Sequence, residues 1–316
     1  MNALTRLALY AVGLVVAFGA AFGIAGAAVP QSVVDNWNKE SDMQNHENHT
    51  PETSGSQAAS LKGLSLAIDG YVLAGLDAPE TTGAEGELTF QIQGPDGAPV
   101  TDFDVEHERD LHLIVVRSDG ANFFHGHPSL DATTGTWSIP WSWDEAGTYR
   151  VYADFNPAGE TGAITLASSL QVGGQFDPVH LEPTRTVEVD GFTVTLDGDL
   201  TAGDSSELTV EVTRDGEAVT TLEPYLGAFG HLVALRQGDL AYLHVHAEGD
   251  EPRDGDTAGP DVRFAAQAPT AGRYLLYLDF QVDGVVHTAE FVLDAGHGSA
   301  HDGSATQTPE GGHDEH

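Results

Sequence analysis

The chain has 316 residues, which is enough for two domains of ordinary size. It carries 49 Asp and Glu residues against 12 Lys and Arg residues, and its formal net charge of −37 disfavours nucleic-acid binding. It contains no cysteine, which excludes disulfides, thiolate metal sites, blue-copper centres and thiol nucleophiles. The sequence also shows no Ser/His/Asp arrangement, phosphate-binding glycine loop or dinucleotide fingerprint, so we do not expect an enzyme.

The N-terminus has the features of an export segment. Arg6 ends a short polar start, and residues 7–29 contain no charged side chain. A spanning helix needs ~20 apolar residues and the core of a cleavable signal only ~7–15, so we predict that residues 1–30 form a membrane anchor. The alternative is a signal cleaved near Ala25-Gly26-Ala27. In both cases we expect the remaining chain to lie outside the cytoplasmic membrane, either anchored to it or secreted.

Polar segments flank the region that we expect to fold. Residues 31–60 predict a disordered linker. Its Met43, His46 and His49 are suited to capturing copper, and the alternative is a solvated tether with incidental histidines. Residues 295–316 are rich in Gly, Ser, His and Asp and predict a disordered tail, which either binds metal weakly or only adds solubility.

Two similar domains are expected between these segments. In residues 61–174, short runs of β-branched and aromatic residues alternate with turn signals, and no helical period follows the anchor. About seven strands at this spacing are typical of an Ig-like or cupredoxin-like β-sandwich. A connector at residues 175–185 leads to residues 186–294, which repeat the plan. The predicted class is therefore all-β, with two tandem sandwiches after one N-terminal helix. The strands expected in the first domain are 64–73, 87–93, 111–117, 121–127, 136–141, 148–155 and 164–172.

One motif occurs in both domains. LHLIVVRSDGANFFHGH spans residues 111–127, and GHLVALRQGDLAYLHVH spans residues 230–246. The first histidine precedes the other two by 13 and 15 positions in each copy. Each copy leads to a similar strand, AGTYRVYADF at 146–155 and AGRYLLYLDF at 271–280. These matches indicate a tandem duplication that carries a histidine trio in each unit: His112, His125 and His127, then His231, His244 and His246.

Hairpin geometry predicts that each trio converges. If Asp119-Gly120 is a two-residue turn, His112 lies opposite His127, and His125 lies two residues along on the same face. Cβ atoms of directly opposite residues are ~4.5–5.5 Å apart, so three imidazoles meet at one point. A turn at Gly238-Asp239 gives the second copy the same register, with His231 opposite His246 and next to His244. We therefore predict one metal site in each domain. The alternative is that the histidines are structural and were inherited with the duplicated domain.

Imidazole ligands without thiolate suit copper(II), zinc(II) or nickel(II), and copper(II) has the highest intrinsic affinity of the three, so we expect copper first and zinc second. Four further residues are held in reserve as ligands or as groups that orient a ligand: His107, Asp154, Asp279 and His287.

The two motifs and the strands that follow them resemble poorly characterised bacterial proteins, mostly actinobacterial, that are anchored or secreted and described as heavy-metal-binding. The resemblance covers roughly residues 62–294 together with the N-terminal anchor. It implies a pair of β-sandwiches outside the membrane, and it maps onto the six histidines of the two trios. One departure is Ala247, which follows the second HxH motif where Pro128 follows the first.

The sequence therefore favours an extracytoplasmic, membrane-anchored metal-binding protein that acts as a buffer, carrier or sensor. Its expected partners are a metal ion and the cytoplasmic membrane, without nucleic acid, and the sequence identifies no protein partner. The alternative is a metal-free tandem β-sandwich that serves as an adhesion or envelope-scaffold module.

Overall fold

The computed structural model describes residues 62–298 except 161, 244 and 254. The predicted anchor (1–30) and linker (31–60), His244 and nearly all of the predicted tail lie outside the described residues. All the described residues belong to one compact unit of the chain. This described part consists of strands, turns and loops, and none of it is a helix suited to crossing a membrane.

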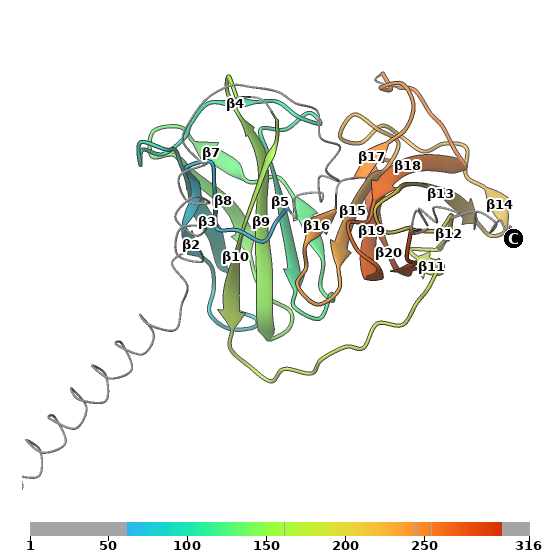
Figure 1. Cartoon of the computed structure of the whole chain (residues 1–316), viewed down its shortest axis with the longest axis horizontal. Coiled ribbons are helices and arrows are strands. Elements are labelled where there is room, and N and C mark those ends of the chain that lie inside the picture. The colour runs from blue at the N-terminus through green and yellow to red at the C-terminus, as the bar shows by residue number, and fades with distance from the viewer. Residues whose placement is uncertain (1–61, 161, 244, 254, 299–316) are drawn as a thin grey trace, which may run out of the picture. The chain divides into compact units, whose positions relative to one another are not determined.

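Two sheets form the first domain (Figure 1). One has the strand order β1 (Ala67–Ile68), β2 (Tyr71–Asp77), β3 (Gly86–Gln93), β8 (Thr136–Trp141) and β7 (Ser129–Asp131). The other has the order β10 (Ile164–Val172), β9 (Gly147–Pro157), β5 (Leu111–Arg117) and β6 (Phe124–Gly126), with β4 (Phe103–Asp104) paired to β9.

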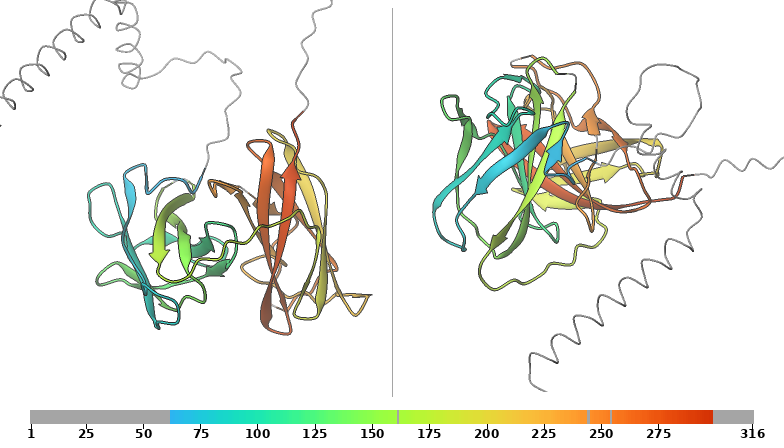
Figure 2. Two further views of the ribbon diagram at one scale, coloured as in Figure 1. Left: turned by 90° about the horizontal axis from the view of Figure 1, so that it is seen from below. Right: turned by 60° about the vertical axis from the view of Figure 1, so that its left-hand side comes forward.

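The second domain repeats this arrangement (Figure 2). Its first sheet has the order β11 (Thr186–Val189), β12 (Phe192–Asp197), β13 (Ser205–Arg214), β18 (Asp261–Gln267) and β17 (Val245–Ala247), with β14 (Glu217–Ala218) paired to β13. Its second sheet has the order β16 (Tyr242–Leu243), β15 (His231–Arg236), β19 (Gly272–Val282) and β20 (Val285–Ala295). Within the described residues, the prediction of an all-β class with two tandem repeats is confirmed.

Alternating burial gives each domain its core. In β3, Leu88, Phe90 and Ile92 point inward, and the residues between them are only partly buried. They pack with Leu113 and Val115 of β5, which belongs to the facing sheet. Side chains alternate between the two faces of a strand, so this pattern closes two sheets into a sandwich.

Strand β5 is buried along its whole length, because both of its faces are covered. Its other face carries Ile114 and Val116, which belong to a separate cluster with Val233 and Leu235 of β15. The outer face of one sheet from each domain therefore contributes to a shared apolar cluster. His112 lies on the same face of β5 as Ile114 and Val116, and His231 lies on the same face of β15 as Val233 and Leu235.

Two expected strands differ from those observed. Residues 64–73 were expected to form one strand, but a turn with positive φ at Asp69 and Gly70 separates β1 from β2. Residues 121–127 form only the short strand β6, and the chain then crosses to β7 in the other sheet.

Candidate metal centre

The first hairpin has the predicted register. Leu113 pairs with Gly126, Ile114 with His125 and Val115 with Phe124. The turn itself differs from the expected one: Gly120 N–H donates to the carbonyl oxygen of Arg117 (2.8 Å), so the turn runs from Arg117 to Gly120. Gly120 has a φ of 91°, a conformation that favours glycine.

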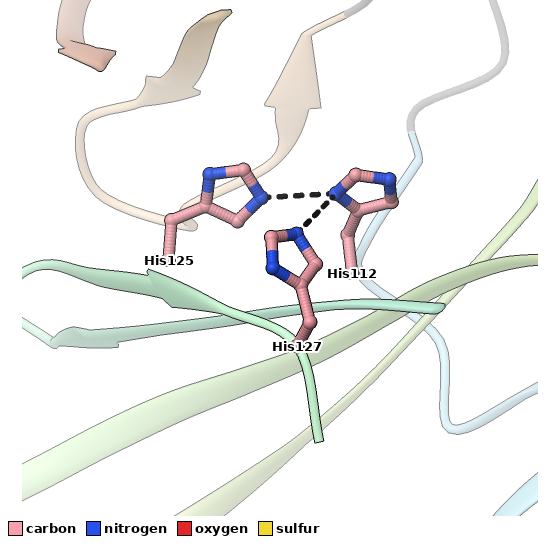
Figure 3. Close-up of side chains that lie close together, drawn as sticks. All are labelled: His112, His125 and His127. Atoms are coloured by element: carbon pink, nitrogen blue, oxygen red, sulfur yellow. Dashed lines mark hydrogen bonds between the residues drawn. The ribbon is translucent and has the colours of Figure 1, made fainter. Parts of the chain in front are cut away.

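Three histidines converge beside this hairpin (Figure 3). His112 Nδ1 lies 3.0 Å from His125 Nε2 and 3.3 Å from His127 Nε2. One ligand atom from each ring lies within 4.8 Å of the others, and this is the trio of potential metal ligands found among the described residues. The side chain of His125 is only 2% exposed, so the cluster is largely shielded from solvent.

The second hairpin starts in the predicted register, but its last histidine, His246, does not pair with its first, His231. Ala234 pairs with Leu243 and Leu235 with Tyr242, as expected. The chain then joins the other sheet, where His246 of β17 pairs with Ala265 of β18. The prediction that His246 lies opposite His231 is therefore wrong.

One substitution explains the early crossover. Val245 packs against the core of the second domain, and the corresponding residue of the first copy is Gly126. A glycine has no side chain to bury, so the first hairpin continues through His125 and Gly126 before the chain crosses to β7.

His231 lies instead beside the histidines of the first domain. Its ring centroid is 5.8 Å from those of both His112 and His125, and 4.8 Å from that of His107. His231 Nε2 is buried and has no hydrogen-bond partner among the described residues. The structure therefore brings residues of both motifs, together with the reserve residue His107, into a single histidine cluster.

Hydrogen bonds at the outer nitrogens define the tautomers of two rings. His112 Nε2 lies 3.2 Å from the carbonyl oxygen of Glu106, and His125 Nδ1 lies 2.8 Å from Asp279 Oδ2. Both partners are acceptors, so both outer nitrogens carry the hydrogen. When both rings are neutral, the lone pairs of His112 Nδ1 and His125 Nε2 face each other at 3.0 Å.

Three of the clustered imidazoles, those of His112, His127 and His231, favour the neutral form. Burial is the main cause of a pKa lowered to about 3 for His112 and to about 4 for His127, and the neighbouring histidines lower both further. Burial, and then the nearby histidines, lower the pKa of His231 to about 2. A neutral imidazole is the form that binds a metal ion.

The reserve aspartates occupy equivalent positions. His112 pairs across the sheet with Asp154, and His231 pairs with Asp279. Thr165 donates to Asp154 Oδ1 and Thr288 to Asp279 Oδ1, both at 2.6 Å. Burial raises the pKa of Asp154. The contact from Asp279 to His125 was not predicted, because nothing in either motif indicates which faces of the two domains meet.

The remaining reserve residue, His287, lies elsewhere. Its Nδ1 is 2.8 Å from Asp190 Oδ2, and its ring packs against Phe192 and Phe280. The histidine cluster itself borders a cavity of about 570 Å³ whose walls come from both domains. Its polar lining includes His107, His112, His125, Asp154, His231 and His246.

These features define a class of protein: a tandem all-β chain whose two domains share a buried histidine cluster. The chain belongs to the family described as "Domain of unknown function (DUF8832)", whose model matches it twice, at residues 66–172 and 187–297. The search of curated proteins finds no match.

Several solved structures resemble the chain at low similarity. The Yersinia pseudotuberculosis adhesin InvE is 13% identical, with a TM-score of 0.21 and coverage of 73% of this chain and 60% of that one. Domains 5–6 of the S-layer protein SbsC are 12% identical, with a TM-score of 0.20 and coverage of 71% and 98%. The D00-D0 domain of intimin is 11% identical, with a TM-score of 0.19 and coverage of 70% and 99%. At these TM-scores, the likenesses carry no argument about this chain.

Proposed function

We propose that this chain binds a transition-metal ion, copper first and zinc second, through His112, His125 and His127. One observation carries the proposal: one ring nitrogen from each of these three histidines lies within 4.8 Å of the others, and His112 Nδ1 and His125 Nε2 are 3.0 Å apart. Two facing lone pairs repel each other unless a cation lies between them. Burial opposes a proton on His112, and the third imidazole, His127, lies 3.3 Å from the same nitrogen, so a metal ion is the cation that engages all three rings.

The distances and the outer contacts support this proposal. A tetrahedral ion at ~2.0–2.1 Å from each nitrogen separates neighbouring nitrogens by about 3.3–3.4 Å. The two short contacts of His112 Nδ1, at 3.0 and 3.3 Å, are close to that separation. Metal-binding histidines also usually donate their second N–H to a carbonyl or carboxylate oxygen, as His112 and His125 do here. Imidazole ligands favour copper over zinc by intrinsic affinity.

In this proposal the protein is a buffer, carrier or sensor rather than an enzyme. We further propose that it acts outside the cytoplasmic membrane, on the basis of the apolar stretch at residues 7–29.

A metal-free adhesion or envelope-scaffold module is the second candidate. The adhesin and the S-layer protein among the similar structures fit it by description, although their TM-scores give that fit no weight. The observation that favours it is the apolar cluster shared by β5 and β15, because two docked domains form a stiff spacer.

Metal titration of the untagged full-length chain separates the two candidates. We expect one tight Cu(II) equivalent that is lost in His127→Gln and retained in His180→Gln, which alters an exposed histidine outside the cluster. The linker and tail histidines are the same in both variants, so they cannot produce the difference. Equal Cu(II) binding by wild type and His127→Gln would exclude the proposed site and favour the scaffold.

A further inference from the structure

We propose that His231 supplies a fourth ligand from the second domain, so that one metal ion joins the two domains. This inference rests on the proposed function and extends it, because it assigns the site to the pair of domains rather than to the first hairpin alone.

The first support is the state of the His231 side chain. Its Nε2 is buried and unpartnered within the described part of the chain. A buried polar nitrogen without a partner is unfavourable in folded proteins, and an imidazole nitrogen in that state beside three other histidines is a candidate metal ligand. The neighbouring rings of His112 and His125 have their centroids 5.8 Å away, and the His231 nitrogen lies just outside the trio whose ligand atoms are all within 4.8 Å of one another, so metal binding would draw it in.

The second support is the way the second domain holds this residue. His231 is the first residue of β15, and its cross-strand partner is Asp279 of β19. Asp279 is also the residue that accepts the hydrogen bond from His125 Nδ1. One pair of adjacent strands therefore brings both an unpartnered imidazole and the group that orients His125 to the same cluster.

The third support is that the two domains dock in a defined, reciprocal way. The Tyr152 hydroxyl donates to the carbonyl oxygen of Leu240, and the Tyr277 hydroxyl donates to that of Gly120, both at 2.6 Å and both buried. Tyr152 and Tyr277 occupy equivalent positions in the repeated strands AGTYRVYADF and AGRYLLYLDF. Each domain thus bonds to the hairpin turn of the other, which fixes His231 relative to the first trio.

A fourth imidazole has a chemical consequence. Zinc sites with four protein ligands are closed and structural, whereas sites with three protein ligands keep an open position for water or substrate. A four-histidine centre therefore suits storage or sensing of the ion, and it makes metal occupancy depend on how the domains are docked.

The test compares Cu(II) and Zn(II) affinity, by competition with a chelator, for the full-length chain and three variants. We expect the His127→Gln and His231→Gln substitutions each to lower the metal affinity of this site. The loss should be at least ~10–100-fold, which is typical when a residue that only hydrogen-bonds to a metal ligand is replaced. His180→Gln should retain wild-type affinity. X-ray absorption of the zinc-loaded chain should count four nitrogen ligands in wild type and fewer in His231→Gln.

Two results would overturn the inference while leaving the proposed function intact. One is wild-type affinity in His231→Gln together with weakened binding in His127→Gln. The other is an unchanged nitrogen count in His231→Gln, which would make His231 a positioning residue. Binding that none of the substitutions alters would instead contradict the proposed function itself. Circular dichroism of each metal-free variant separates ligand loss from misfolding.

Discussion

His125 Nδ1 and Asp279 Oδ2 lie 2.8 Å apart, although 154 positions separate the two residues in the chain. Both side chains are almost completely buried, at 2% and 4% exposed. Thr288 donates to the other carboxylate oxygen, so Asp279 is held from both sides. Asp279, in the second domain, therefore holds the hydrogen on His125 Nδ1. This leaves His125 Nε2 available to a metal ion bound by the first domain.

Asp279→Asn tests this relationship. An amide in place of the carboxylate turns an acceptor into a group that also donates, so it no longer fixes the tautomer of His125. We expect metal affinity to fall ~10–100-fold, as it does for other changes in outer-shell partners. Asp154→Asn, at the equivalent position of the first domain, is the matched control and should have the smaller effect. Equal affinities for the two variants would contradict the role of Asp279.

The metal-free protein should lose stability as the pH falls below about 6.5. The pKa of His112 is about 3 in the folded state, below the ordinary histidine value of 6.5, so the unfolded chain takes up a proton first. The stability contributed by neutral His112 is complete above pH 6.5 and is lost as the pH falls towards the folded pKa. The slope is at most ~1.4 kcal/mol per pH unit for one such group.

Urea unfolding of the metal-free chain between pH 6.5 and 5 measures this slope. His112→Gln should flatten it by about 1 kcal/mol per pH unit, because the variant has no proton to take up at this position. The exposed control His180→Gln should retain the wild-type slope. If His112→Gln matches wild type across this range, the buried imidazole is not the group that titrates.

The reciprocal tyrosine contacts should contribute to stability. Tyr277→Phe keeps the ring but leaves the buried carbonyl oxygen of Gly120 without its donor. We expect a loss of ~1–3 kcal/mol in the free energy of unfolding, and a similar loss for Tyr152→Phe. Tyr71→Phe should cost less, because its hydroxyl makes a longer contact of 3.4 Å with Glu160. Equal costs in all three variants would argue against a docked interface.

Metal binding should in turn stabilise the folded protein. A ligand that binds only the folded state, present at 100 times its dissociation constant, adds about 2.7 kcal/mol. We expect Cu(II) to raise the unfolding midpoint of wild type and to raise that of His127→Gln much less. A similar rise in both proteins would assign the stabilising site to other residues.

The sequence was sufficient to predict the repeat, the all-β class and the register of both hairpins, because these depend on local spacing. The pairs Ile114–His125 and Ala234–Leu243 are the ones that register predicts. The divergence of the second copy depends on Val245, whose side chain packs in a core that the hairpin pattern does not describe. A hydrophobic residue in place of Gly126 is visible in the sequence, but its consequence appears only with the packed domain.

The placement of His231 could not be predicted for a related reason. Its neighbours in the cluster belong to the other domain, and contacts across a domain interface leave no periodic trace in the sequence. The sequence of β5 did contain a hint, since LHLIVVR has only two polar residues, His112 and Arg117, and they lie on opposite faces. A strand with two apolar faces predicts a covered outer surface but does not identify what covers it.

The most direct measurement of the central claim is an anomalous-scattering map from zinc-loaded crystals of the full-length chain. We expect a single strong peak that lies ~2.0–2.1 Å from His112 Nδ1, His125 Nε2 and His127 Nε2. His231 should belong to the same coordination sphere. Two peaks, one in each domain, would restore separate sites and contradict the shared centre. An absence of any peak among these four histidines would contradict the metal site itself.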